Sequence, residues 1–234
     1  MDLRHLPPSP SPGLVNLLVE IPAGSRNKYE YCAQSGLMVL DRVLHASVRY
    51  PFDYGFIPNT LAEDGAPLDA MVIMAEPTFA GCLIRARPIG LLDMNDHGAY
   101  DGKILCVPEA DPRQASINSI RQIGATRLED VAEFFRTYRN FDGRVVTIKG
   151  WRDAHAVQPL LDSCIAAFSR CLDRSVRVCL PGVYERICRR VLGIPATRLE
   201  RVKWFERPRG GRNRPRFSSE GSCQSQKWRL GRPR

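Results

Sequence analysis

The 234-residue sequence has no run of about 18 apolar residues, the length that a membrane-spanning helix requires. Residues 1–12 are rich in proline and serine, and they lack the apolar core of a secretory signal peptide. These absences argue against a membrane protein and against an exported one. We therefore expect a cytoplasmic protein that does not enter the membrane.

Closely spaced cysteines are also missing. The chain has eight cysteines, but none of them forms a Cys-x-x-Cys pair. Structural zinc sites use such pairs, and disulfides are rare in the reducing cytoplasm. We predict that the cysteines are reduced and that most of them are buried as small apolar side chains.

Positive charge is scarce in the first part of the chain. Residues 1–169 hold 16 Lys and Arg against 20 Asp and Glu, whereas residues 170–234 hold 18 against 5. The formal net charge of +9 therefore describes the C-terminal part. We expect three regions: a Pro/Ser-rich segment at 1–14, a globular domain at 15–169 and an Arg-rich basic extension at 170–234.

The basic extension consists mainly of Arg, Gly, Pro and Ser from about residue 207, a composition typical of disorder. Dense arginines can bind the phosphates of nucleic acids. This segment has no aromatic platform and no nucleic-acid-binding motif. Two alternatives stay open, nucleic-acid binding through the basic tail and an extension without such a role, and the second is favoured.

The globular domain begins with short strands separated by tight turns, before any long helix. This order is typical of a β-barrel or a β-sandwich. Residues 28–31 and 37–42 are predicted to form a hairpin, 50–58 an ordered packed loop and 93–103 an acidic loop. The remaining expected strands are 15–21, 70–74, 81–92, 104–107 and 144–151.

Two helices are expected after most of these strands. Thr126 and Glu129 have the spacing of a capping box at a helix N-terminus. The apolar residues behind them recur at helical spacing up to Tyr138, so this face should pack on the barrel. Asp153 is expected to cap a second helix that ends near Phe168.

The stretch from Asp64 to Asp69 places two carboxylates five residues apart, with Gly65 and Pro67 between them. Such a turn can aim both carboxylates at a hard cation such as Mg²⁺, although an isolated turn of this kind is more often a solvated surface turn. Asp96 and Asp101 repeat the same spacing in the second acidic loop. The other candidates near these turns are acidic, basic or phenolic residues: Glu20, Glu30, Lys28, Arg42, Lys103, Tyr50, Tyr54, Tyr138 and Arg139.

Clustered carboxylates need cations, and clustered Lys and Arg need anions. Mg²⁺ together with a phosphorylated substrate meets both demands, which favours metal-assisted phosphoryl chemistry. Several stretches also follow one another in a familiar order: Glu20-Ile21-Pro22, Ser25 to Glu30, Leu40-Asp41-Arg42, Tyr50 to Pro58, Thr60 to Gly65, Pro67-Leu68-Asp69, Arg85 to Gly90, Asp101-Gly102-Lys103 and Phe134 to Tyr138. With these stretches the chain resembles the soluble family I inorganic pyrophosphatases over residues 15–168.

The resemblance implies a mainly β fold with flanking helices, an α+β arrangement around a five-stranded OB-like barrel. It implies Mg²⁺-dependent hydrolysis of pyrophosphate to two phosphates by metal-activated water, and a homo-oligomer, a hexamer in bacterial members. By position, the implied metal ligands are Asp64, Asp69 and Asp101, with Asp96 and Glu20 as further acidic groups. The implied substrate contacts are Lys28, Arg42, Tyr54, Lys103, Tyr138 and Arg139, and the implied catalytic residues are Asp64, Asp69, Asp101 and Tyr54.

One departure from the family pattern touches the chemistry. The pattern is Asp-Gly-Asp-Pro-x-Asp, and Ala66 stands at its middle aspartate, the residue that the family uses to accept the proton of the attacking water. Losing a general base typically costs about 10²–10⁴-fold in rate. A catalytically weakened homologue that still binds Mg²⁺ and pyrophosphate is therefore the alternative. Two further departures are His97, where an acidic residue is common, and Arg139, where lysine is common.

Overall fold

Five strands form the centre of the molecule and close into a ring. In the computed structural model, β1 (Val15–Ile21) pairs with β4 (Asp53–Ile57), β4 with β5 (Leu68–Val72), β5 with β8 (Lys103–Pro108), and β8 with β6 (Leu83–Asp96). β6 then pairs with β1 and closes the barrel. Only β5 and β8 run parallel, and the other four pairings are antiparallel. The predicted five-stranded, mainly β barrel is confirmed.

The structure describes residues 3–45, 47–139 and 145–177. The predicted disorder from about residue 207 lies outside these residues, as does most of the Arg-rich extension. Within them, residues 3–14 lie against the barrel, because the Asn59 side chain donates to the carbonyls of Leu3, Arg4 and Leu6. No helix in these three stretches is long and apolar enough to cross a membrane.

Four further strands of the described residues lie outside this ring, and two of them form a separate sheet. The predicted hairpin is confirmed as β2 (Asn27–Cys32) and β3 (Leu37–Val43), which pair antiparallel. β9 (Val146–Asp153) pairs with β6, and the short strand β7 (Ala99–Tyr100) folds back on the end of β6. The expectation of an acidic loop over 93–103 was therefore partly wrong, because pairing with β9 keeps β6 extended through Asp96.

The predicted loop at 50–58 is also partly a strand, since β4 spans Asp53–Ile57 and all its residues are buried. Gly55 explains why this aromatic stretch fits a central strand. A Cβ atom on Gly55 would stand 1.9 Å from the carbonyl oxygen of Leu18, so only glycine lets β4 approach β1 this closely. The turn at Asp64–Asp69 leads into β5, which begins two residues earlier than the expected 70–74.

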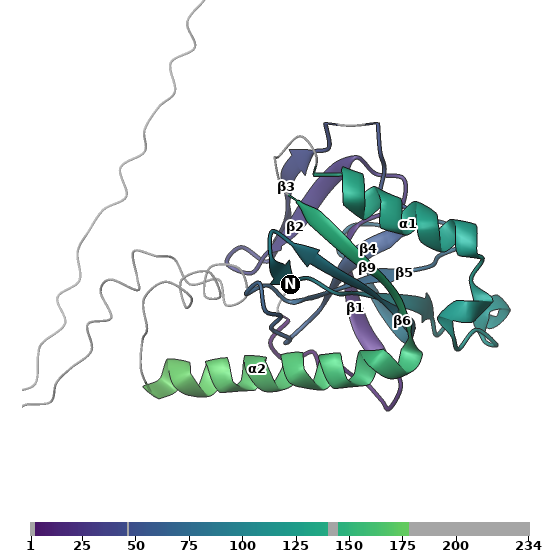
Figure 1. The fold of residues 1–234 in the computed structure, drawn as a ribbon. Helices are drawn as coiled ribbons and strands as arrows, with labels where there is room; N and C mark the ends of the chain where they lie inside the picture. The colour runs from purple at the N-terminus through teal and green to yellow at the C-terminus, as the bar shows by residue number, and fades with distance from the viewer. Residues whose placement is uncertain (1–2, 46, 140–144, 178–234) are drawn as a thin grey trace, which may run out of the picture.

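Two long helices cover the barrel on different sides (Figure 1). Helix α1 (Ala125–Thr137) packs Val131, Phe134 and Phe135 into one core cluster. Helix α2 (Val157–Arg177) packs Leu161 and Cys164 into a second cluster on the other side. The predicted packing of the first helix on the barrel is confirmed. Among the described residues the short helices are η1 (Pro112–Gln114), η2 (Ile120–Gln122) and η4 (Ala154–Ala156).

The starts of both long helices differ in detail from expectation. The predicted capping box is wrong, because α1 begins at Ala125 with Gly124 as its N-cap and no side-chain cap, which leaves Thr126 inside the first turn. Asp153 does act as a cap, but of η4, where it accepts from the Ala154 N–H. α2 then runs past the expected end at Phe168 to Arg177.

The five described cysteines are all free. Cys106 and Cys164 are buried, whereas Cys32, Cys82 and Cys171 are partly buried, so burial is less complete than predicted. The other cysteines lie outside the described residues.

Asp53 joins three separate segments at the start of β4. Its carboxylate is fully buried, and it accepts from the Ala23 N–H at 2.7 Å, the Thr78 N–H at 2.8 Å and the Thr78 hydroxyl. Ala23 follows β1 and Thr78 precedes β6, so one carboxylate holds both connections against the strand that carries Tyr54.

We expect Asp53→Asn to lower the free energy of unfolding by about 1–3 kcal/mol, because the amide puts a donor where the carboxylate accepts from N–H and O–H groups. Urea unfolding measures this effect. Asp162→Asn is the matched control, since Asp162 is exposed on α2 and accepts from Gln158, and we expect it to change stability by less than about 0.5 kcal/mol. Equal effects of both variants would contradict this prediction.

Candidate active site

A buried network joins four of the predicted site residues at the barrel. Asp69 Oδ2 accepts from the Tyr54 hydroxyl at 2.6 Å and from Lys103 Nζ at 2.5 Å, and Lys103 also donates to Asp101 Oδ1. The Lys103 side chain is only 2% exposed. Because β4, β5 and β8 are neighbours in the sheet, residues distant in the sequence meet here. The barrel therefore brings two carboxylates, one ammonium group and one phenol within hydrogen-bonding distance of one another in a single network.

Charge and burial set the protonation states in this network. Burial alone favours the neutral amine of Lys103, but the charges of Asp69 and Asp101 outweigh it and raise the pKa of Lys103. Burial, and then the negative charge of Asp69, raise the pKa of the Tyr54 phenol well above its usual value. Lys103 is therefore a permanent cation, and Tyr54 is a neutral hydrogen-bond donor.

The carboxyl group of Asp101 has a raised pKa. Burial raises the pKa of its carboxyl, the charge of Lys103 opposes this, and the charges of Asp69 and Asp64 add to it. Asp64 itself is exposed, and its Oδ1 accepts from the Ala66 N–H at 2.9 Å. The two acidic turns are thus close enough for their charges to interact.

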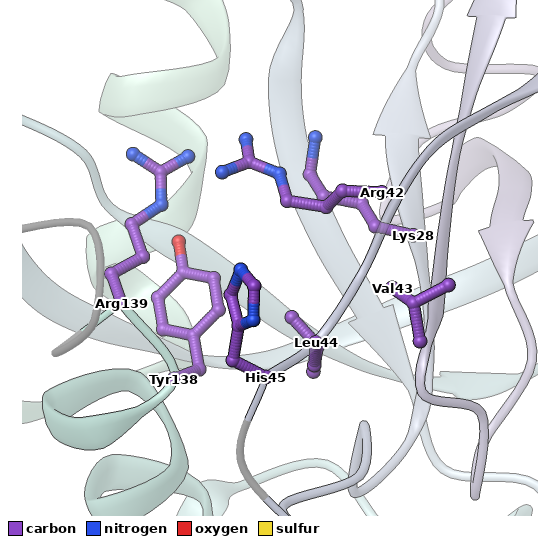
Figure 2. A pocket seen from close by; sticks show the side chains of 7 residues that line it. All are labelled: Lys28, Arg42, Val43, Leu44, His45, Tyr138 and Arg139. Carbon is purple, nitrogen blue, oxygen red and sulfur yellow. The ribbon is translucent and has the colours of Figure 1, made fainter.

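A second group of predicted residues lines a pocket with an empty volume of about 250 Å³, which includes its open mouth (Figure 2). Lys28 and Arg42 face each other across the β2–β3 hairpin, and both contact Asp41, at 3.0 and 2.9 Å. Lys28 also pairs with Glu30, as expected for residues on one face of a strand. Tyr138 and Arg139 enter the pocket from the end of α1.

Asp96 has a different cationic partner from Asp69 and Asp101: it pairs with Arg139 at 2.5 Å, with both side chains largely buried. The Arg139 guanidinium also lies over the Tyr138 ring, 5.3 Å from its centroid. Burial raises the pKa of Tyr138, while the charges of Lys103 and Arg139 oppose that rise. Tyr138 is therefore within electrostatic reach of both the carboxylate network and the pocket.

Glu20 also has a hydrogen-bond partner: its carboxylate accepts from the Tyr31 backbone N–H at 2.7 Å. In the part of the chain that the structure describes, no three His, Cys, Asp or Glu side chains converge closely enough to hold one metal ion. Lys103 instead supplies the positive charge between Asp69 and Asp101.

The donor set nevertheless fits a hard divalent cation. Asp69 and Asp101 already converge on one cationic group. The pKa of Asp101 is raised by burial and also by the negative charge of Asp69, and a further cation would relieve that charge repulsion. Carboxylate oxygens are also the ligands that Mg²⁺ prefers.

Sequence reasoning missed two residues of this region. Asp41 contacts Lys28, and His45 lines the pocket beside Tyr138 (Figure 2). Glu30, which also pairs with Lys28, was predicted to lie on the same strand face. His45 gave only a weak signal, because it lies beyond the end of β3 and only the tertiary fold turns it toward α1.

Comparison with known proteins places the chain in a family. The family model described as inorganic pyrophosphatase matches residues 17–169. An inorganic pyrophosphatase from a Synechocystis species is 56% identical over 165 residues, which cover 70% of this chain and 98% of that protein. One from a Nostoc species is 53% identical over 168 residues, which cover 72% and 99%.

A solved structure agrees with these relatives. The crystal structure of inorganic pyrophosphatase from Thermus thermophilus superposes with a TM-score of 0.69 at 39% identity, covering 72% of this chain and 99% of that one. The matched part of the chain thus covers nearly the whole length of these proteins. The chain belongs to the inorganic pyrophosphatase family.

Proposed function

We propose that the protein hydrolyses inorganic pyrophosphate to two phosphates in a Mg²⁺-dependent reaction. The observation that carries this proposal is the buried Tyr54–Asp69–Lys103–Asp101 network beside a pocket lined by Lys28, Arg42 and Arg139. Carboxylates next to guanidinium and ammonium groups suit a substrate that is a polyanion bound together with divalent cations.

The cationic residues are proposed to hold the phosphates. Arg42 and Arg139 can each give two N–H donors to phosphate oxygens, and Lys28 adds a point charge from the neighbouring strand. Lys103 remains protonated and balances negative charge near Asp69 and Asp101. The hydroxyls of Tyr54 and Tyr138 orient phosphate oxygens without adding charge.

Mg²⁺ would be held principally by Asp69 and Asp101, together with Asp64 from the adjacent turn, and Asp96 and Glu20 are further acidic groups. When bound, Mg²⁺ neutralises phosphate charge and lowers the pKa of a coordinated water. Asp96 and Glu20 each have another partner, Arg139 and the Tyr31 backbone, through one carboxylate oxygen.

Phosphate release from pyrophosphate tests the function directly. We expect release with Mg²⁺ and none when EDTA removes it. A rate no higher than that of a Mg²⁺-only blank, measured at high protein concentration, would exclude the function. Calorimetric binding of pyrophosphate without turnover would instead favour the alternative, a weakened homologue in which Ala66 cannot accept a proton.

Tyr54→Phe is expected to reduce kcat about tenfold, because it removes one hydrogen bond to a charged group, worth about 1.5 kcal/mol. Steady-state hydrolysis measures the effect. Tyr29→Phe is the matched control, since the Tyr29 hydroxyl accepts from the neutral Asn27 amide, at 2.9 Å. A Tyr54→Phe enzyme as fast as the control would remove Tyr54 from the proposed set.

A homo-oligomer, a hexamer by resemblance, and a cytoplasmic location also belong to the proposal. Four apolar side chains are exposed on β3, and a second copy could cover them: Leu37, Val39, Leu40 and Val43. Light scattering of the full chain tests the assembly, and a monomer at micromolar concentration would reject it.

A further inference from the structure

We propose that the N-terminal segment 3–14, here called the strap, positions the β2–β3 hairpin and through it the two pocket cations Lys28 and Arg42. The inference rests on the proposed function, because these cations are proposed to hold the phosphates of pyrophosphate. Leu3 and Asn59 do not belong to the lining of the pocket described above. They are positioning residues, which act on the pocket through the hairpin.

Two asparagines hold the strap on the barrel. Asn59, which follows β4, donates from its side chain to three carbonyls of residues 3–6, at 2.7 to 3.3 Å. Asn16 of β1 is buried, and its side chain donates to the Pro7 carbonyl and its N–H to the Pro8 carbonyl, both at 2.8 Å. The first half of the strap is therefore fixed to the ends of two barrel strands.

The strap places Leu3 against a small apolar cluster that includes the hairpin. Leu18 of β1, Tyr31 of β2 and Phe56 of β4 form the buried part of this cluster, and Leu3 packs against it. The rings of Tyr31 and Phe56 lie 6.2 Å apart. Among the described strands, β2 and β3 pair only with each other and not with the ring. Side-chain packing at Tyr31, which Leu3 completes, therefore seats this end of the hairpin on the barrel.

The other end of the hairpin has an anchor of its own. Just before β2, the Gly24 N–H donates to the Tyr50 carbonyl at 2.8 Å, and the Tyr50 N–H donates to the Ser25 carbonyl at 3.1 Å. The hairpin is thus held at two separate places, by these backbone bonds and by the cluster at Tyr31.

A β-bulge lies between the two anchors. Lys28 is opposite Arg42 but Tyr29 is opposite Leu40, so Asp41 is the extra residue of β3. Such a bulge bends the strand that carries it. Asp41 contacts both Lys28 and Arg42, at 3.0 and 2.9 Å. The angle of the hairpin about this bulge therefore sets where both cations stand in the pocket.

Leu3→Ala is expected to raise KM for pyrophosphate about fivefold and to change kcat by less than about twofold, a size usual for residues that act through others. Asn59→Gly should do the same, because glycine keeps the backbone conformation of Asn59, with φ 57°, and removes only the side chain. His5→Ala is the matched control, since His5 is exposed on the same strap, and it should leave KM unchanged.

A double-mutant cycle separates positioning from a general loss of stability. Calorimetry on the full chain measures the affinity for imidodiphosphate with Mg²⁺, a probe whose binding needs no turnover. In an Arg139→Met background Leu3→Ala should still weaken binding about fivefold, because Arg139 belongs to α1 and not to the hairpin. In an Arg42→Met background the effect should shrink to about twofold, since one of the two cations that the strap positions is gone.

Hydrogen exchange gives a second readout of the same contact. In Leu3→Ala the amides of β2 should exchange faster while those of β5 keep their rates, because only the seating of the hairpin is lost. Unchanged imidodiphosphate affinity in both Leu3→Ala and Asn59→Gly, or an equal loss in the two arginine backgrounds, overturns the proposal. Coupled imidodiphosphate binding without phosphate release from pyrophosphate would refute the proposed function and leave the role of the strap standing.

Discussion

Lys103→Met is expected to lower the free energy of unfolding by about 3–5 kcal/mol, the usual cost of removing one partner from a buried ion pair. The Lys103 side chain is 2% exposed and donates to both Asp69 and Asp101, which are themselves mostly buried. Without the ammonium, two carboxylates face each other in a site that already raises the pKa of Asp101. Urea unfolding at neutral pH in EDTA measures the loss.

The pH range of this effect follows from the direction of the pKa shift. The pKa of Lys103 is raised in the folded protein, so its stabilising effect is fully present below the unfolded value of about 10.4 and is lost only as the pH rises through the higher folded value. The stability difference between Lys103→Met and the unaltered protein should therefore stay constant from pH 7 to 9.

The unfolding experiment on Lys103→Met includes a Mg²⁺ addition and a control variant. If Asp69 and Asp101 hold Mg²⁺, adding it should restore part of the stability of Lys103→Met, because the cation replaces the missing charge. Lys149→Met should cost less than about 0.5 kcal/mol, since Lys149 is half exposed and its ammonium lies 3.9 Å from Asp93. A Lys103→Met protein as stable as this control would show that the network contributes nothing to folding.

Ala66→Asp is expected to raise kcat for pyrophosphate by about 10²-fold or more, the range that a general base typically supplies. Ala66 lies in the acidic turn, its side chain is 7% exposed, and its N–H donates to Asp64. A carboxylate at this position would join Asp64 and come within electrostatic reach of Asp101. Steady-state kinetics with Mg²⁺ measure the change.

The same substitution has a second, opposite effect on stability. A further carboxylate beside Asp64 and Asp101 should destabilise Ala66→Asp in EDTA, because like charges repel in this partly buried turn, and Mg²⁺ should reverse this. Ala66→Asn is the matched control, as it has nearly the same size but neither the charge nor a basic oxygen, and it should give no rate gain. Equal rates for Ala66→Asp and Ala66→Asn would mean that position 66 does not limit turnover, and the weakened-homologue alternative would be dropped.

Local patterns predicted those elements whose partners lie nearby in the chain. The strand at Val15–Ile21 and the β2–β3 hairpin follow from apolar content, alternation and turn residues within a few positions. The apolar face of α1 follows from helical spacing, and Phe134 and Phe135 are indeed buried. These are properties of short segments, and short segments suffice to define them.

Elements whose conformation depends on a distant partner were misjudged. β4 resembled a loop because Gly55 and its aromatic neighbours are turn-like in isolation, whereas the close approach of Leu18 makes glycine a requirement of the strand. The end of β6 resembled an acidic loop, and pairing with β9, some fifty residues further on, keeps it extended. Neither of these long-range contacts can be predicted from the residues next to it in the sequence.

The sequence by itself determined the family resemblance, the acidic turn from Asp64 to Asp69 with Ala66 inside it, and the residue types of the site. Only the tertiary structure decided their partners. It placed Lys103 between Asp69 and Asp101, paired Asp96 with Arg139, and brought His45 to the pocket. The physical reason is that charge pairing depends on distance in space. The tertiary fold pairs Asp69 with Lys103, 34 positions apart, and Asp96 with Arg139, 43 positions apart, and no local pattern connects these residues.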